Sequence, residues 1–156
     1  MDSELEFAIQ SSTTGKHIFD QILLKNSTYF ADFLNSDRTE FPIENVTYSE
    51  MKQLLRILNP EAQVPNVSRF PAILQLAETF NIPSIRLFIE FYLMLYDEMP
   101  IKEKIEMADK FGMNNLPEQC CNALKSIDEV KELVTNMELS EGVKAKLFDK
   151  CISLSK

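Results

Sequence analysis

The sequence predicts an α+β fold, in which short N-terminal strands accompany a cluster of helices and an all-helical extension follows. Three observations predict it. Residues 5–9 begin with alternating apolar and polar side chains, which is the period of a strand. From residue 21 onward, apolar side chains recur at helical spacing. Two similar helix–turn–helix segments, residues 76–85 and 107–116, are offset by 31 positions.

The two similar segments leave two interpretations open. They are either copies of one unit or unrelated helical hairpins whose apolar spacing is alike, and the pattern alone does not decide. Two copies are too few for a solenoid, which needs about three or more. Helix–turn–helix units bury apolar faces and supply few reactive groups. A chain that contains them is therefore expected to hold partners rather than to convert substrates.

Length and charge limit the function. The chain has 156 residues, of which 45% are hydrophobic and 26% charged, so one domain with a helical appendage is expected. Its net charge of −8 repels phosphate backbones, which argues against a nucleic-acid partner. The N-terminus lacks a signal-peptide pattern, and no apolar run is long enough to span a membrane. We therefore expect a soluble protein of the cytoplasm, the nucleus or both, without a membrane partner.

The first third of the chain is predicted to contain three strands and two short helices. Residues 5–9 and 16–19 are expected to pair as a hairpin across a polar turn. The Ser–Thr pair at 27–28 is a predicted cap between two short helices. Residues 39–43 resemble an edge strand, because Pro42 cannot donate a hydrogen bond to a neighbouring strand.

The middle of the chain carries helix start and stop signals. Thr47 and Glu50 have the spacing of a capping box. The helix behind them is expected to stop at Asn59–Pro60, and Ser68 is a predicted cap for the next one. The helix that follows, from about residue 82 to 96, is apolar almost all round. Such a helix needs a cover on both sides.

Residues 101–154 are predicted to form four short amphipathic helices without a strand. Gly112 ends the first, where a left-handed residue is wanted. Ser126 and Glu129 have the spacing of a second capping box, and Ser140 begins the last helix. The change in character near residue 100 divides the chain.

We therefore predict two domains, residues 1–98 and residues 99–156. The boundary between them contains no glycine- and serine-rich linker. The two parts are consequently expected to pack together.

Groups for catalysis or cofactor binding are scarce. The chain has only three glycines, too few for a phosphate-binding loop, and one histidine, His17, which cannot build a multi-histidine metal site. Cys120, Cys121 and Cys151 form no Cys-x-x-Cys motif and are expected to be buried apolar residues. We predict no enzyme activity, no catalytic residue, no metal and no cofactor. An enzyme remains the minor alternative, with His17 or Cys120 as its reactive group.

The order of these elements resembles the BTB/POZ domain family. Residues 26–34 are similar to the family's S-x-x-F-x-x-x-F segment, and residues 41–60 to its strand and following helix. Residues 73–85 are similar to the L-x-L-A-D-x-F-x-V-x-x-L helix pair. Residues 105–116 and 124–129 resemble the helical extension of BTB proteins that carry a MATH domain upstream. The resemblance assigns residues 1–98 to a BTB/POZ-like domain and residues 99–156 to a BACK- or 3-box-like extension.

The resemblance implies a protein-binding module that acts as an adaptor or scaffold. Many members homodimerise through their N-terminal helices, and many bind cullin-3 as substrate adaptors of ubiquitin ligases. The predicted dimer interface comprises Ile22, Leu23, Tyr29, Phe30 and Phe33, for which core packing is the alternative role. A predicted partner surface comprises Leu34, Tyr48, Met51, Tyr92 and Tyr96.

The chain also departs from the family pattern. The usual first strand is short, and no MATH domain is recognised before it. Cullin-binding members carry an apolar-x-Glu motif after the second helix, whereas Phe33-Leu34-Asn35 has no glutamate. The alternative is a linker resembling Skp1 or elongin-C, which shares the fold core. It would grip an F-box-like or SOCS-box-like helix with residues 100–156.

Overall fold

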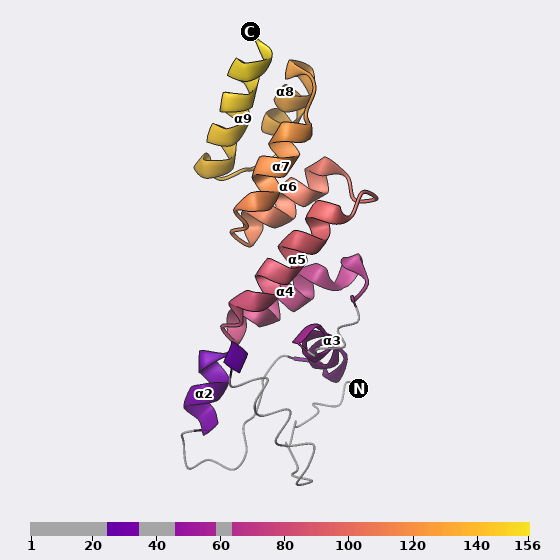
Figure 1. The fold of residues 1–156 in the computed structure, drawn as a ribbon, viewed down its shortest axis with the longest axis vertical. Coiled ribbons are helices and arrows are strands. Elements are labelled where there is room, and N and C mark those ends of the chain that lie inside the picture. Colours follow the sequence, from indigo (N-terminus) through magenta and orange to yellow (C-terminus); the bar gives the residue numbers. More distant parts are fainter. Residues whose placement is uncertain (1–24, 35–45, 59–63) are drawn as a thin grey trace. The chain divides into compact units, whose positions relative to one another are not determined.

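The structure, a computed structural model, describes residues 25–34, 46–58 and 64–156. Within these ranges every regular element is a helix (Figure 1). In chain order the elements are α2 Thr28–Leu34, α3 Tyr48–Leu58, the 3-10 helix η1 Val67–Arg69, α4 Phe70–Thr79, α5 Pro83–Leu95, α6 Ile101–Lys110, α7 Asn115–Ala123, α8 Ile127–Asn136 and α9 Glu141–Leu154.

The predicted α+β fold is wrong for the part of the chain that the structure describes, which is helical throughout. The residues predicted as strands, 5–9, 16–19 and 39–43, lie outside the described residues. The physical reason is the apolar period. From residue 46 onward, buried side chains recur every three or four residues, which buries one side of a helix. The strand prediction depended on alternations of about five residues, too short to determine a fold class.

Two capping boxes begin helices as predicted. At α3, the Thr47 amide donates to Glu50 Oε2 at 2.9 Å, and the Glu50 amide donates to Thr47 Oγ1 at 3.3 Å. At α8, the Ser126 amide donates to Glu129 Oε2 at 3.3 Å, and the Glu129 amide donates to Ser126 Oγ at 3.2 Å. Each pair satisfies backbone donors that the first turn of a helix leaves without an internal acceptor.

The cap predicted at Ser68 is wrong. Ser68 lies inside η1, and its amide donates to the side-chain oxygen of Asn66 at 3.0 Å. Asn66 is therefore the N-cap of η1. The single 3-10 turn of η1 leads directly into α4. Pro71 occupies the first turn of α4, where the missing amide hydrogen costs no hydrogen bond.

The chain divides into two compact units, residues 1–85 and 86–156. The division falls inside α5, after Ile85. The domain boundary predicted between residues 98 and 99 stays a prediction.

In the first unit, α3 packs against α4, and the start of α2 is fixed to the turn after α4. The ring centroids of Phe30 and Phe80 are 5.0 Å apart, and both rings are buried. The buried Ser27 hydroxyl donates to the carbonyl oxygen of Phe80 and accepts the Phe30 amide at 3.2 Å. Asn81 Nδ2 donates to Thr28 Oγ1 at 2.6 Å. Ser27 thus caps α2, as predicted, and also attaches it to α4.

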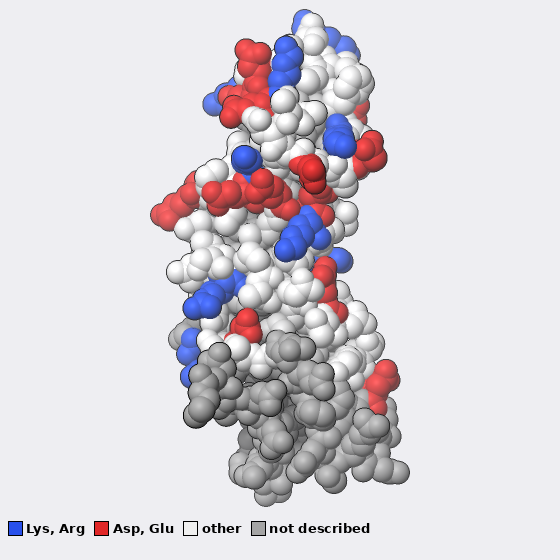
Figure 2. Space-filling model, turned by 180° about the vertical axis from the view of Figure 1, so that it is seen from behind, with Lys and Arg blue, Asp and Glu red and all other residues white. Residues whose placement is uncertain are grey.

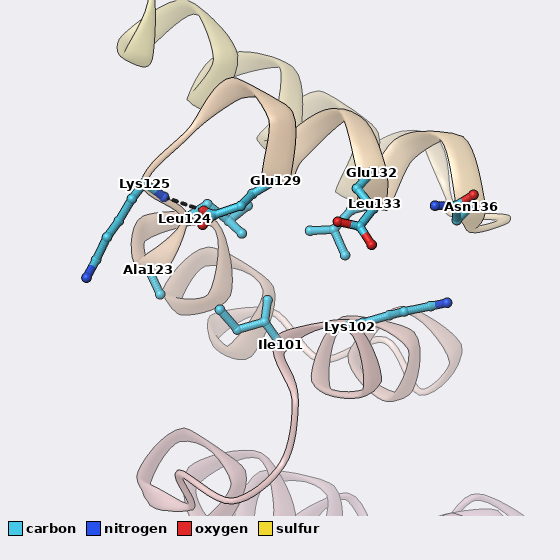
Figure 3. Close-up of a pocket in the computed structure, with 9 residues that line it drawn as sticks. All are labelled: Ile101, Lys102, Ala123, Leu124, Lys125, Glu129, Glu132, Leu133 and Asn136. Carbon is cyan, nitrogen blue, oxygen red and sulfur yellow. Dashed lines mark hydrogen bonds between the residues drawn. The ribbon is translucent and has the colours of Figure 1, made fainter.

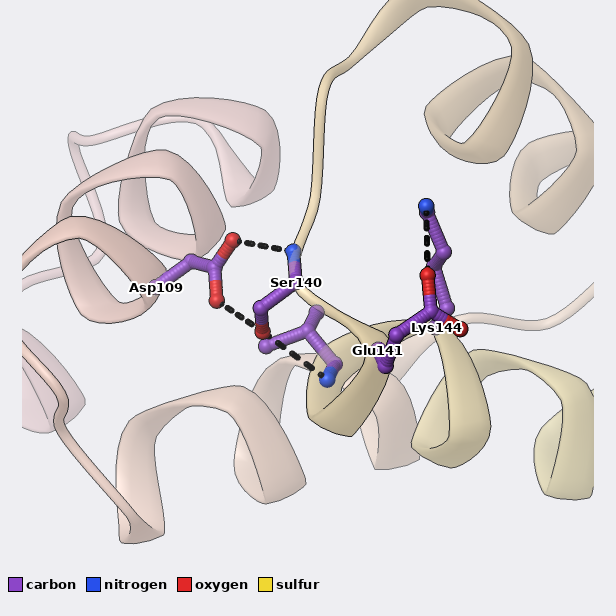
Figure 4. Close-up of polar contacts among 5 residues, drawn as sticks. Asp109, Ser140, Glu141 and Lys144 are labelled. Carbon is purple, nitrogen blue, oxygen red and sulfur yellow. Dashed lines mark hydrogen bonds and ion pairs between the residues drawn. The ribbon is translucent and has the colours of Figure 1, made fainter.

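The second unit contains α5 from Arg86 onward and α6 to α9, with α6 packed on α7 and with α7 and α8 both packed on α9. Asp109, near the end of α6, accepts hydrogen bonds from the amide of Ser140, at 2.7 Å, and from its hydroxyl (Figure 4). Ser140 is the N-cap of α9, so this carboxylate holds the start of α9 against α6. One turn further, Lys144 Nζ lies 3.1 Å from Glu141 Oε1.

The two helix–turn–helix segments have the same backbone hydrogen bonds. The Phe80 amide donates to the Leu76 carbonyl, and the Ile82 amide to the Ala77 carbonyl, at 2.9 and 2.7 Å. The amides of Phe111 and Met113 repeat these bonds 31 positions later, to the carbonyls of Met107 and Ala108, at 3.1 and 2.8 Å.

Each of these turns passes through one left-handed residue, Asn81 with φ +50° and Gly112 with φ +60°. Glycine and asparagine are the residues that adopt this conformation at least cost. The likeness between the two segments therefore extends from apolar spacing to backbone geometry.

Candidate interaction surfaces

The most apolar exposed surface of the described residues lies along α5. Leu87, Phe91 and Leu95 are spaced four residues apart and are 47%, 55% and 84% exposed. Residues four apart lie above one another on a helix, so the three side chains form one stripe. We call these three residues the α5 stripe. The buried residues Ile89 and Leu93 lie on the other side of the helix. The sequence predicted a cover on both sides of this helix, and the described residues cover only one side.

The charged residues of α5 lie off the stripe. The helix carries one arginine, Arg86, and one glutamate, Glu90. Arg86 is half-buried and Glu90 is 2% exposed. The polarity expected of a surface helix, with charges outside and apolar side chains inside, is thus partly inverted.

Glu90 is buried because its carboxylate caps α7. Glu90 Oε1 accepts the backbone amides of Asn115 and Leu116 at 2.5 and 2.9 Å, and Oε2 lies 3.4 Å from Asn115 Nδ2. A carboxylate at a helix N-terminus is stabilised by the free amide groups and by the helix dipole. This contact links α5, the helix that carries the α5 stripe, to the start of α7.

Tyr92 and Tyr96, two residues of the predicted partner surface, lie beside the α5 stripe. Their rings are stacked, with centroids 5.6 Å apart, and both side chains are half-buried. The Tyr96 hydroxyl donates to Glu98 Oε2 at 2.7 Å. This hydrogen bond to a carboxylate raises the pKa of Tyr96 above its usual value. Aromatic side chains of this kind are enriched in protein interfaces.

The other predicted residues have different environments. Tyr29 is 37% exposed, and its ring centroid lies 5.4 Å from that of Phe80. Phe30 and Met51 are buried. Phe33 and Leu34 belong to α2, and Tyr48 begins α3, but the structure does not describe their side chains. Ile22 and Leu23 lie outside the described residues. The predicted dimer interface and the predicted partner surface both stay predictions.

A shallow pocket of about 430 Å³ lies in the second unit. The start of α6, the end of α7 and one side of α8 line it (Figure 3). Ile101, Leu124 and Leu133 supply its apolar lining, and Lys102 and Glu132 are among its polar residues. Glu129 also lines it, but its carboxylate already caps α8. The pocket has room for a few apolar side chains of a partner.

The cysteines lack the environment of a nucleophile. Burial raises the pKa of Cys120 to about 11 and raises that of Cys121 in the same direction. His17 lies outside the described residues. Among the residues that could be searched for one, no group of histidine, cysteine, aspartate and glutamate is arranged to hold a metal ion.

Charge and helix length add two further observations. On the face drawn in Figure 2, the described lysine and arginine side chains are scattered among acidic ones and form no continuous basic patch. No helix in the described ranges has the length and apolar character needed to cross a membrane.

Sequence reasoning did not single out Leu87, Phe91 and Leu95. The signal was present, since the nearly continuous apolar character of this helix predicted that a second side needed a cover. Which side stays exposed follows from tertiary contacts, which bury Ile89, Leu93 and the Glu90 carboxylate.

Comparison with known proteins identifies the family of this arrangement. A family model of the BTB/POZ domain matches residues 9–94. A BTB/POZ domain-containing protein of Caenorhabditis elegans is 27% identical over 88% of this chain and 46% of its own length. The BTB and MATH domain-containing proteins 36 and 38 of the same organism are 26% and 22% identical, over 76% and 81% of this chain.

The chain spans less than half the length of these curated relatives, with 39% and 33% of the two BTB and MATH domain-containing proteins covered. No solved structure matches.

Proposed function

The chain belongs to the BTB/POZ domain family, and from this premise we propose that it is a self-associating adaptor that binds other proteins through exposed helix faces. BTB domains are generally protein–protein interaction modules. The finer proposal is that this chain binds a second copy of itself and a different protein at the same time. A scaffold or adaptor needs both contacts, because it brings two partners together.

The α5 stripe is the observation that carries this proposal. Three neighbouring large apolar side chains, each about half exposed or more, cover one side of a helix that carries only two charged residues. Contiguous apolar surface of this kind marks sites of protein interaction. In the rest of the described chain, apolar side chains of this size form the cores of the two units or are exposed in smaller groups.

Cullin-3 is the specific partner that we propose for the adaptor role. Support comes from the family and from the similarity to BTB and MATH domain-containing proteins. The missing glutamate after Phe33-Leu34 means that binding would use other contacts than the usual motif. The Skp1-like alternative is favoured by one observation, the pocket between α6, α7 and α8, which could hold apolar side chains of an F-box-like helix.

Light scattering over a range of concentrations tests self-association. We expect the mass to rise from that of the 18.0 kDa chain toward twice that value. A mass that stays at the monomer value at high concentration would contradict the self-association.

Binding assays with a purified cullin-3 N-terminal region and with an F-box peptide distinguish the two partner classes. The adaptor proposal expects saturable binding of the cullin fragment, and the alternative expects binding of the peptide alone. Glu132→Lys changes only the rim of the pocket, so it should weaken peptide binding and leave cullin binding unchanged.

A further inference from the structure

The α5 stripe is symmetric in its residue order. Leu87, Phe91 and Leu95 read leucine, phenylalanine, leucine in both directions, with equal spacing of four residues. When two such helices lie antiparallel and cross at Phe91, Leu87 of one copy faces Leu95 of the other. Phe91 then lies on the two-fold axis. A two-fold interface requires self-complementarity of this kind, because the same patch meets itself.

Charge limits where two copies of this chain can meet. Each chain carries a net charge of −8, so two chains repel one another over most of their surfaces. Close approach is least opposed where the surface carries no charge, as along the α5 stripe. Contact cores of homodimers are likewise depleted in charge and enriched in aromatic residues.

A second exposed apolar patch among the described residues, a pair on α9, differs from the α5 stripe in residue order and in charge. On α9, Phe148 and Ile152 are 66% and 45% exposed. The pair has no symmetric order, and the helix around it carries the ion pair of Lys144 with Glu141. Phe148 therefore provides a matched control: an exposed phenylalanine of the same unit in a mixed-charge surrounding.

We propose that the α5 stripe is a contact between two copies of this chain, with the two α5 helices antiparallel across a two-fold axis. This inference rests on the self-association proposed above and names one of its contact surfaces. It is distinct from the predicted dimer interface around Tyr29. If both contacts form, assemblies larger than a dimer follow.

The size of the contact sets its strength. The stripe extends over eight residue steps of 1.5 Å, or about 12 Å. The largest apolar patch on a typical monomer is about 300–600 Å². A stable interface needs roughly 1,000 Å² in total, so the α5 contact is expected to be weak and dependent on concentration. It would reinforce another contact between the same chains.

Cysteine cross-linking tests the geometry directly. In a background of Cys151→Ser, the Phe91→Cys variant should form a disulfide between position 91 of two copies under mild oxidation. Leu87→Cys and Leu95→Cys should cross-link to each other at least fivefold faster in a mixture than either does alone. Phe148→Cys is the control. If Phe91→Cys cross-links no faster than Phe148→Cys, the proposal is overturned.

A charge substitution tests the same contact in solution. Phe91→Glu should raise the dissociation constant of the self-association that includes α5 by tenfold or more, and Phe148→Glu should leave it unchanged. Circular dichroism of both variants checks that they stay folded, which their exposure predicts.

The outcomes separate the two proposals. If the native chain self-associates but Phe91→Glu has no effect, the α5 contact is wrong and self-association stands. If the native chain is monomeric throughout, both are wrong. If Phe91→Cys is shielded from small thiol reagents in the monomer, another part of the chain covers the stripe, and the proposal is overturned. If Phe91→Glu abolishes binding of a purified partner and Phe91→Cys does not cross-link, the stripe binds that partner and the proposal is overturned.

Discussion

The carboxylate of Glu90 accepts the backbone amide of Asn115 at the start of α7, 25 positions along the chain. It also accepts the next amide, that of Leu116. A buried acid in the middle of α5 therefore serves as the cap of another helix. On the same helix, Ile89 and Leu93 are also buried, whereas Leu87, Phe91 and Leu95 are exposed.

Replacing Glu90 with alanine should destabilise the second unit by about 1–3 kcal/mol, since two amides at the start of α7 lose their acceptor. The loss should appear as a lower midpoint in urea unfolding followed by circular dichroism. Glu90→Gln retains an acceptor oxygen and should lose less. Glu106→Ala, at an exposed position of α6, is the matched control. Equal stability of Glu90→Ala and Glu106→Ala would show that the cap contributes nothing.

The two described glycines make a second matched pair. Gly112→Ala places a Cβ on a residue with φ +60°, 4.0 Å from Arg86 Nη1, so the cost is backbone strain of about 1–2 kcal/mol and not a clash. Gly142→Ala lies inside α9, where the added Cβ would meet Ser140 Oγ at 3.9 Å, an ordinary contact, and the change should stabilise the protein by about 0.4–1 kcal/mol. Thermal unfolding of the two variants should shift in opposite directions. A shift of the same sign in both would contradict the role of the left-handed turn.

The sequence was most informative where the determining contact is local. The capping boxes at Thr47 and Ser126 and the left-handed Gly112 each depend on residues within a few positions of one another, and the structure confirms them. The fold class depended on pairing between distant segments, which a short alternation cannot specify. The cap predicted at Ser68 was wrong because a 3-10 turn before α4 was not foreseen.

The candidate surface could be predicted only in part. The continuous apolar character of α5 indicated a second face in need of a cover. The choice of Leu87, Phe91 and Leu95 as that face required knowledge that Glu90 is buried against α7, a contact across 25 positions. Phe30 and Met51, two residues of the predicted surfaces, are buried, which for Phe30 agrees with the core-packing alternative.

The capping box of α3 should make stability depend on pH. Hydrogen bonds from the Thr47 amide and hydroxyl lower the pKa of Glu50 below its usual value of 4.5. The folded state then binds this proton less readily than the unfolded chain. The contribution of Glu50 is therefore complete above pH 4.5 and disappears as the pH falls through the lowered value.

Unfolding of the native chain and of Glu50→Gln should be compared at neutral pH and near pH 3. The native chain should be more stable than Glu50→Gln at neutral pH. The difference between their free energies of unfolding should become smaller near pH 3. Glu78→Gln, at an exposed position of α4, should show no such narrowing. A difference that is constant across this range would contradict the pKa shift of Glu50.

Thiol reactivity tests whether Cys120 could act as a nucleophile. Burial raises its pKa to about 11, so near neutral pH only a minute fraction is thiolate, the reactive form. Cys121 is shifted in the same direction, and Cys151 is the least buried of the three. Ellman's reagent should therefore modify about one thiol per folded chain, and Cys151→Ser should remove that signal. All three should react in urea. Rapid modification of Cys120 in the folded Cys151→Ser variant would mean that the thiol is activated, and the enzyme alternative would then have a chemical basis.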